Sequence, residues 1–142
     1  MAPDITGAVF TGNSAEGEGA IYSNSFLASL SCGDCTFRDN TATGDGGAVI
    51  DWGNVDGGLS GTFAAGGNGG GDGGAVWLSD NGGNGLSGTF RSNTAGGNGG
   101  AVYIDADDLD DYITGSFIAW NAAGGNGGAI YDGGDDTGPA AG

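Results

Sequence analysis

Two short phrases recur along this chain at a nearly constant interval. The first is Gly-Gly-Ala followed by Val or Ile, which begins at Gly46, Gly73, Gly99 and Gly127 and is shortened at Gly19–Ile21. The second centres on a phenylalanine, and the five phenylalanines are separated by 27, 26, 27 and 27 residues. Two phrases that keep one period indicate one structural unit, or coil, repeated about five times.

The apolar residues alternate with a period of two and show no helical spacing. In Leu59–Phe63 and Leu86–Phe90 the first, third and fifth residues share one face, as expected of short strands with phenylalanine inward. The Val or Ile of the glycine phrase is expected to point inward as well. The sequence therefore predicts an all-β protein without significant helix, a parallel β-helix (β-solenoid). We expect one domain, 1–142, that is a fragment of a longer protein, with coils at about 5–31, 32–58, 59–85, 86–112 and 113–142.

Composition alone favours a different interpretation. Leu, Ile, Val and Phe make up only 24 of 142 residues, 36 residues are glycine, and the net charge is −16. These values are typical of a disordered acidic segment. A disordered segment has no reason to hold its few large apolar residues at fixed intervals, so the repeat favours a folded stack.

The charge distribution excludes several functions. The chain has 16 Asp and 2 Glu, no Lys or His, and only Arg38 and Arg91 as cations. Such a surface repels nucleic acid and anionic lipid, so neither is an expected partner. Histidine and lysine, two common general bases, are absent, and the carboxylates have almost no basic partner. We therefore expect that the protein is not an enzyme. No apolar run is long enough for a transmembrane segment.

Residues at equivalent positions are expected to stack as ladders through the core and at one corner. The amide ladder would satisfy backbone groups at a bend. Coil three has Gly66 where an asparagine is expected, and in coil five the asparagine is displaced behind Trp120. The predicted ladders are Phe10, Phe37, Phe63, Phe90 and Phe117, and Asn13, Asn40, Asn93 and Asn121.

The chain has one Cys-x-x-Cys pair, Cys32 and Cys35. Without a second pair or a histidine it cannot complete a zinc site. A local disulfide formed in an oxidising compartment and two free thiols both remain open.

The paired phrases resemble the repeat of the chlamydial polymorphic outer-membrane proteins, whose hallmarks are Gly-Gly-Ala-(Ile/Leu/Val) and Phe-x-x-Asn. The second hallmark is present at Phe10–Asn13, Phe37–Asn40 and Phe90–Asn93, whereas coils three and five depart from it. The resemblance implies that the parallel β-helix is right-handed, of the kind found in autotransporter passengers and adhesins. It also implies a secreted or cell-surface location, with attachment to the outer membrane through a missing part of the protein.

Two sets of residues are candidates for binding. The residues after the inward Val or Ile should point outward as a ladder, which would form a binding face unless the chain's own loops cover it. The aspartate-rich segment beginning at Asp105 is either a solvated loop or a calcium site. The candidate binding face is Tyr22, Ile50, Trp77, Tyr103 and Tyr131. The candidate calcium ligands are Asp105, Asp107, Asp108, Asp110 and Asp111.

Two further columns of polar residues have open interpretations. Asp45, Asp72, Asn98 and Asn126 precede the glycine pairs, where they would either form turns or bind a bridging cation. The outward hydroxyls resemble the arrays of ice-binding solenoids, although any strand with polar outward residues gives the same pattern. These hydroxyls are Ser60, Ser87 and Thr114, and Thr36, Thr62, Thr89 and Ser116.

The sequence therefore predicts a structural or adhesive segment of a secreted or cell-surface repeat protein. Its expected partner is a protein or glycan of another surface, bound through an outward face or through loops. Self-association into an extracellular fibre by end-to-end stacking is the alternative, and an ice-binding module is the third. No cofactor is expected beyond calcium.

Overall fold

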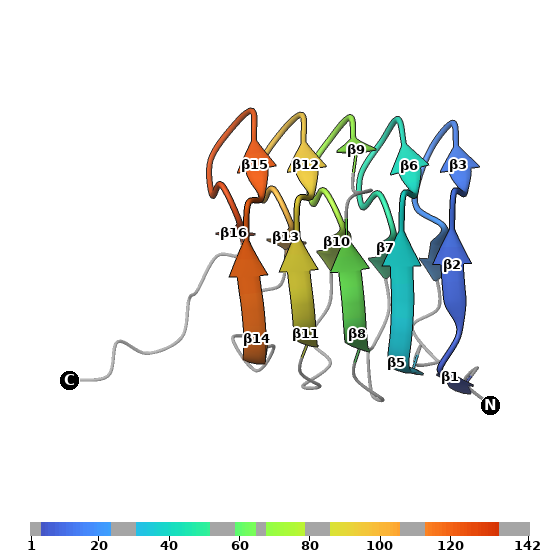
Figure 1. The fold of residues 1–142 in the computed structure, drawn as a ribbon. Coiled ribbons are helices and arrows are strands. Elements are labelled where there is room, and N and C mark those ends of the chain that lie inside the picture. Colours follow the sequence, from blue (N-terminus) through green and yellow to red (C-terminus); the bar gives the residue numbers. More distant parts are fainter. Residues whose placement is uncertain are drawn as a thin grey trace.

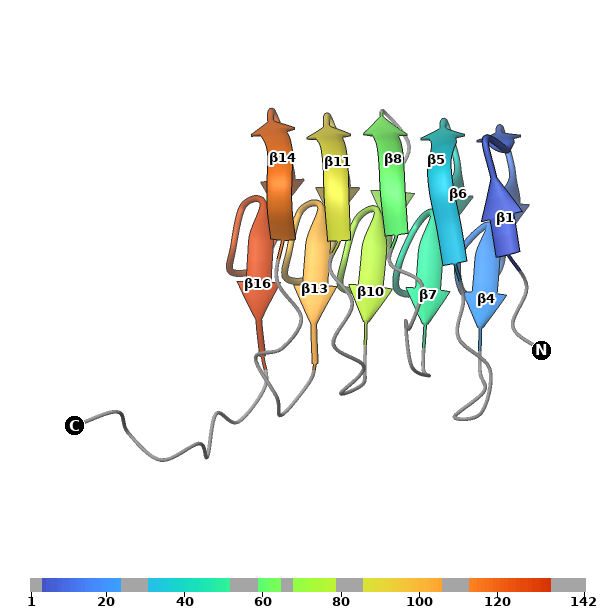
Figure 2. The same cartoon turned by 90° about the horizontal axis from the view of Figure 1, so that it is seen from below.

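The chain winds into a stack of coils in which every strand pairs in parallel with its equivalents in neighbouring coils (Figures 1 and 2). The computed structural model describes residues 4–23, 31–51, 59–64, 68–78, 86–105 and 113–133. These ranges contain sixteen strands and no helix, which confirms the predicted fold class, a parallel β-solenoid. No helix able to cross a bilayer occurs in them.

Three sheets run along the stack, and each coil contributes to all three. The first sheet holds the longest strands, the second lies at the bend above it in Figure 1, and the third follows the glycine phrase. Strands of the first sheet are β1 (Asp4–Thr6), β2 (Val9–Thr11), β5 (Ser31–Arg38), β8 (Leu59–Ala64), β11 (Leu86–Arg91) and β14 (Ile113–Ala119). Strands of the second are β3 (Ser14–Ala15), β6 (Thr41–Ala42), β9 (Asn68–Gly69), β12 (Thr94–Ala95) and β15 (Ala122–Ala123). Strands of the third are β4 (Ile21–Ser23), β7 (Val49–Asp51), β10 (Val76–Leu78), β13 (Val102–Ile104) and β16 (Ile130–Asp132).

A stack of phenylalanine rings forms the centre of the core. Phe10, Phe37, Phe63 and Phe90 follow one another with ring centroids 4.9, 4.9 and 4.7 Å apart and nearly parallel planes. Phe37, Phe63 and Phe90 are fully buried. The inward valines of the glycine phrase, Val49, Val76 and Val102, are also fully buried and complete this core from the third sheet. The stack explains how a chain with few large apolar residues can bury a continuous core.

Coil five continues the core with a different residue from the one expected. In the pairing of β11 with β14, Phe90 lies opposite Ile118, and Phe117 lies opposite Thr89. The register shifts because β14 has one more residue than β11 between the positions of Ser87 and Thr89. Ile118 therefore packs against the core at the position predicted for Phe117. Asn121 then follows Ile118 at the spacing at which Asn93 follows Phe90.

The two glycines of the repeated phrase are required for different reasons. The first has a positive φ in each described copy, for example 64° at Gly99, a conformation that favours glycine. At Gly74 and Gly100 the second has no room for a side chain, because an ideal Cβ on each would lie 2.2 Å from the carbonyl oxygen of the equivalent glycine in the next coil. The phrase is thus a turn followed by a close contact between coils.

The asparagines form a hydrogen-bonded ladder at the bend between the first and second sheets. The Nδ2 of Asn93 donates to the carbonyl oxygen of Phe63 at 3.1 Å and to Oδ1 of Asn121 at 3.0 Å. Asn121 in turn donates to the carbonyl of Phe90. Asn40 makes the equivalent bond to the carbonyl of Phe10 and accepts from Asn13. Asn93 therefore ties three consecutive coils together, while Asn40 and Asn121 each tie their own coil to the preceding one.

Replacing Asn93 with alanine is expected to lower the free energy of unfolding by about 2 kcal/mol, because it removes the hydrogen bonds to the carbonyl oxygen of Phe63 and to Oδ1 of Asn121. Asn93 is only 1% exposed, whereas Asn13 is exposed at the first coil. Urea unfolding followed by circular dichroism measures both variants. A loss in Asn13→Ala as large as that in Asn93→Ala would contradict the proposed role of burial.

Candidate binding face

The predicted aromatic ladder exists in the third sheet, but it is not an open strip. Trp77, Tyr103 and Tyr131 stack with ring centroids 6.0 and 5.3 Å apart. Ile50 is 0% exposed and Trp77 is 5% exposed, while Tyr22 at the first coil is 50% exposed. The expectation of a continuous exposed face is therefore wrong at Ile50 and Trp77, which are buried.

The preceding glycine turn explains part of this burial. The turn folds back over the ladder so closely that an ideal Cβ on Gly46 would lie 2.4 Å from Cγ1 of Ile50. At the next coil a Cβ on Gly73 would lie 3.2 Å from Cβ of Trp77. The backbone itself therefore packs against these side chains, and a flat surface accessible along the whole ladder does not form.

Burial and nearby carboxylates raise the pKa of Tyr103 in the ladder. Burial raises the pKa of the Tyr103 phenol, and the carboxylates of Asp105 and Asp72 raise it further. The phenol of an unfolded chain loses its proton near pH 10. Because the pKa is raised, the phenol of folded Tyr103 keeps its proton at that pH. The stability contributed by the neutral phenol is thus complete below about pH 10 and is lost as the pH rises through the folded pKa.

Tyr103→Phe is expected to reduce the alkaline loss of stability, because phenylalanine carries no proton to lose. Urea unfolding above and below about pH 10 measures the slope, and phenolate absorbance measures the titration directly. The same fall in stability with pH in wild type and Tyr103→Phe would show that Tyr103 is not responsible.

The predicted calcium ligands are only partly within the described residues. Asp105 is exposed directly after β13, and Asp107, Asp108, Asp110 and Asp111 lie outside the described ranges. Within those ranges no three His, Cys, Asp or Glu side chains come together as metal ligands. Calcium binding by the aspartate-rich segment stays a prediction.

The side chains of the Asp and Asn residues before the glycine pairs accept hydrogen bonds from backbone N–H groups of the next coil. Oδ1 of Asp45 accepts the backbone N–H of Asp72 at 2.7 Å, and Oδ1 of Asp72 accepts that of Asn98 at 2.5 Å. Asn98 accepts the N–H of Asn126 at 2.8 Å. The column thus joins successive coils through hydrogen bonds, which gives these residues a structural role.

Cys32 and Cys35 form a disulfide within β5, with Cα atoms 5.9 Å apart and both side chains fully buried. The register with β8 shifts between the two cysteines, so the disulfide spans a bulge. Asp34 lies at the bulge with a φ of 53°, and its backbone N–H donates to Oγ of Ser60 at 3.0 Å. The bulge therefore places a carboxylate at the outer surface of the first sheet.

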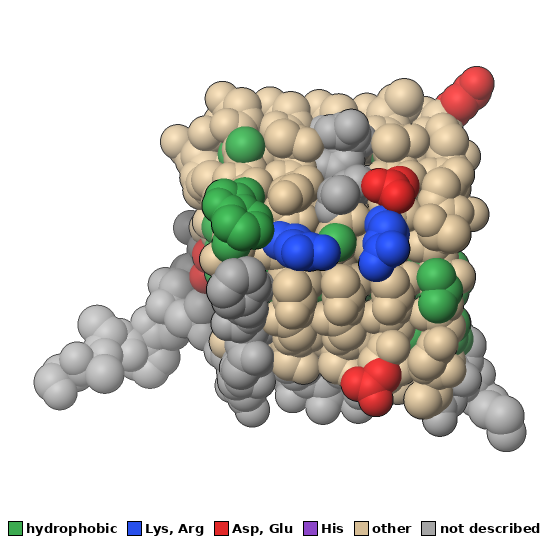
Figure 3. All heavy atoms as spheres, in the orientation of Figure 1, with side chains coloured by type: hydrophobic (Ala, Val, Ile, Leu, Met, Phe, Trp, Pro, Cys, Tyr) green, Lys and Arg blue, Asp and Glu red, His purple; other side chains and the backbone are tan. Residues whose placement is uncertain are grey.

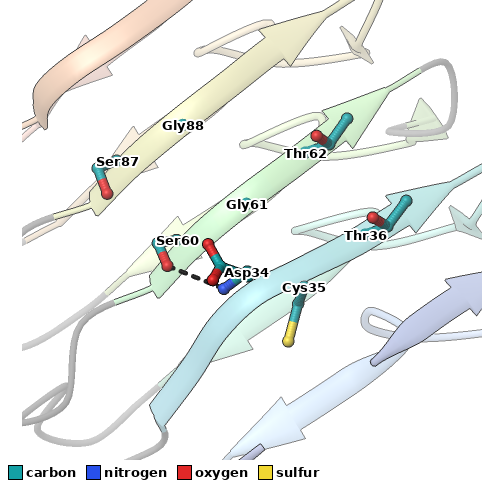
Figure 4. Close-up of a pocket in the computed structure, with 8 residues that line it drawn as sticks. All are labelled: Asp34, Cys35, Thr36, Ser60, Gly61, Thr62, Ser87 and Gly88. Atoms are coloured by element: carbon teal, nitrogen blue, oxygen red, sulfur yellow. Dashed lines mark hydrogen bonds between the residues drawn. The ribbon is translucent and has the colours of Figure 1, made fainter. Parts of the chain in front are cut away.

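Beside this bulge lies a shallow hollow of about 550 Å³ on the outer surface of the first sheet, here called the hydroxyl groove (Figure 4). Gly61 and Gly88 lie along its middle, where an ideal Cβ would approach a carbonyl oxygen of the preceding coil to 1.9 and 2.0 Å. Figure 4 shows serine hydroxyls on one side of these glycines and threonine hydroxyls on the other. The lining residues are Asp34, Cys35, Thr36, Ser60, Gly61, Thr62, Ser87 and Gly88.

Sequence reasoning identifies the hydroxyl columns but not the groove. The signal is the repeated Ser-Gly-Thr at 60–62 and 87–89. Alternation alone makes its glycine an inward residue of a strand, whereas the structure shows φ values of 142° and 128° and close contact between coils. Stacked glycines flanked by stacked hydroxyls make a hollow that neither column would make alone.

The two arginines lie on the same surface as the hydroxyl groove. Arg38 pairs with Ala64 in the next coil, and Ala64 pairs with Arg91 in the coil after it. Figure 3 shows both basic side chains on one face of the molecule. A second hollow of about 350 Å³, lined by Val9, Thr11, Thr36 and Arg38, adjoins the groove at Thr36. We call the surface formed by both hollows and both arginines the outer face.

Comparison with known proteins supports the repeat assignment. Residues 34–49 and 87–105 match the Chlamydia polymorphic membrane protein repeat. These stretches contain both hallmark phrases of coils two and four, and together they cover less than half of the chain. No curated protein and no solved structure matches the chain. The first-sheet strands of coils three and five, which the match does not include, pair in parallel with the strand of matched coil four. The chain is therefore a β-solenoid repeat protein whose coils are similar to the Chlamydia polymorphic membrane protein repeat.

Proposed function

We propose that this chain is a structural and adhesive segment of a secreted or cell-surface repeat protein and that it has no catalytic role. The stacked coils form a stiff scaffold, and the outer face presents binding groups to a partner on another surface. The similarity to a membrane protein repeat supports the location. Fold alone does not determine function, so the proposal depends on the character of the outer face.

The observation that carries this proposal is the regular outer face of the first sheet. Hydroxyl groups occur there at equivalent positions of successive coils, beside two adjoining hollows and both cations of the chain. Polar groups repeated on a rigid sheet suit a repetitive or extended partner. The hollows are shallow and lie on the surface, a form that suits contact between surfaces better than enclosure of a small substrate.

The proposal is tested by displaying the chain on a non-adherent bacterium through an unrelated membrane anchor. Cells that display the chain are expected to adhere to cultured epithelial cells more strongly than cells that display the anchor alone. Protease treatment of intact cells checks that the chain is outside. Equal adherence of both strains, with the chain shown to be displayed, would overturn the adhesive function.

Self-assembly into a fibre is a second candidate, favoured by one observation. Among the described strands, β4 and β16 lie at the two edges of the third sheet and each pairs on one side only. Unpaired strand edges promote association with another chain. Sedimentation velocity over a concentration series is expected to show growing oligomers if this candidate holds, and a monomer at every concentration would remove it.

A further inference from the structure

The two arginines of this acidic chain, Arg38 and Arg91, lie in one row along the stack on the outer face, here called the arginine row or simply the row. Because Arg38 and Arg91 hold the same ladder position with Ala64 between them, they are two coils, or about 10 Å, apart along the stack. Neither guanidinium forms an ion pair with a carboxylate of the described residues. Guanidinium groups bind carboxylates through paired hydrogen bonds, so the row offers two such sites at a fixed spacing.

Trp120 lies one residue beyond the position of the arginines, in the coil after Arg91, and its backbone conformation is costly for tryptophan. It follows Ala119, the residue paired with Arg91, and its side chain is 76% exposed. Its φ is 56°, a left-handed conformation that bulky residues rarely adopt. The equivalent positions in other coils hold Gly12, Asp39 and Ser92, which are small or polar. The fold does not need tryptophan here, and a strained backbone and an exposed aromatic ring are both typical of a binding surface.

The hollows beside the row indicate the shape of the ligand. The hydroxyl groove extends over three coils from Asp34 to Ser87, and the second hollow adjoins it at Thr36. An elongated ligand lying along the stack could contact the hydroxyls and both arginines at once. Sugar rings carry the hydroxyl groups that such a surface can hydrogen-bond and the flat apolar face that an indole can cover.

We infer that the outer face binds a carboxylate-bearing polysaccharide aligned with the solenoid axis. Arg38 and Arg91 bind carboxylates two sugar rings apart, the hydroxyl groove beside the arginines accepts hydrogen bonds from and donates them to the sugar hydroxyls, and Trp120 stacks on a ring. This inference rests on the proposed adhesive function and names the partner's chemistry.

Charge favours this ligand over two other occupants. A second copy of the chain carries the same net charge of −16 and would be repelled as a whole. A densely acidic peptide would bring carboxylates against Asp39, which directly follows Arg38. A polymer with a carboxylate on alternate rings places few charges on the face, and screening over about 8 Å at physiological salt limits repulsion from the rest of the chain.

The test uses hyaluronan oligosaccharides, in which every second ring carries a carboxylate, and calorimetric titration of the whole chain. Wild type is expected to bind them and to lose binding when the carboxylates are methyl-esterified. Equal affinity for the esterified probe, or no binding of the acidic one, would overturn the inference. Equally tight binding of poly-glutamate would also overturn it, because carboxylates without sugar rings would then suffice.

Variants of the row assign the residues. Arg38→Gln and Arg91→Gln are each expected to weaken binding about tenfold, the usual loss for a charge-assisted hydrogen bond. Ser14→Asp makes the net charge equally more negative on β3, in the second sheet, and should leave affinity unchanged. If this control weakens binding as much as the arginine variants do, general repulsion explains the effect and the two proposed sites are wrong.

Trp120→Asn separates binding from folding. Asparagine tolerates a left-handed φ, so this variant should raise the urea midpoint, while loss of the ring should weaken binding about fivefold. Asp39→Asn keeps a residue suited to its φ of 55° and removes a negative charge beside Arg38, so affinity should rise. Unchanged affinity in both variants would remove Trp120 and the local charge from the binding surface.

The display assay distinguishes failure of this inference from failure of the proposed function. Adherence by wild type that Arg38→Gln and Arg91→Gln leave unchanged would overturn the polysaccharide site and retain an adhesive chain. Absence of adherence together with titratable hyaluronan binding would retain the site and reject adhesion.

Discussion

Gly100→Ala is expected to lower the free energy of unfolding by about 3 kcal/mol, a loss typical of severe overpacking. The added Cβ would lie 2.2 Å from the carbonyl oxygen of Gly128 and 2.6 Å from that of Ala122. Both contacts are with backbone that hydrogen-bonds between coils, so relief requires the coils to separate locally. Urea unfolding with an unchanged m-value would measure the loss within one folded state.

Gly128→Ala is the matched control, because Gly128 holds the same place in the repeat but an added Cβ there would meet nothing within 4 Å. It should change stability by less than about 0.5 kcal/mol. If the two alanine variants are equally stable, the second glycine of the phrase is not required by contact between coils.

Phe63→Ala is expected to cost about 4 kcal/mol, within the range for a fully buried aromatic residue. The ring of Phe63 is 1% exposed and stacks on Phe37 and Phe90 at 4.9 and 4.7 Å, so its removal interrupts the core at mid-stack. The two halves of the stack would then unfold with less cooperativity, because each coil is stabilised by its neighbours.

Phe10→Ala tests the dependence on position within the same ladder. Phe10 stacks on one neighbour, Phe37, and is only partly buried, so about half the loss of Phe63→Ala is expected. Thermal unfolding by calorimetry gives both values. A Phe10→Ala variant less stable than Phe63→Ala would contradict a core that is strongest at its centre.

The sequence predicts the fold because the features that define it are periodic. Strand, ladder and turn all recur every coil, so the position of Phe63 can be inferred from Phe37 and Phe90 although coil three lacks its asparagine. The exception is coil five, where one extra residue in β14 places Ile118 opposite Phe90. A bulge changes register without changing the pattern of residue types, so the residue pattern points to Phe117.

The candidate site is harder to predict because it depends on contacts between coils. The alternation that places Ile50 and Trp77 outside the core does not indicate that the glycine turn packs against them. The row of arginines, in contrast, has a sequence signal: Arg38 follows Phe37 and Arg91 follows Phe90 directly. Two cations at one repeat position, in a chain of net charge −16, are enough to indicate a basic line along the stack.

Backbone amide hydrogen exchange tests most directly whether the coils form one stacked unit. The N–H groups of Gly74, Ala75 and Val76 donate to carbonyl oxygens of the following coil at 3.0, 2.8 and 2.9 Å. A stacked solenoid predicts that these amides exchange only through opening that approaches global unfolding. Exchange of these amides at the rate of an unstructured peptide would show that the repeats do not stack, and would contradict the solenoid and every surface derived from it.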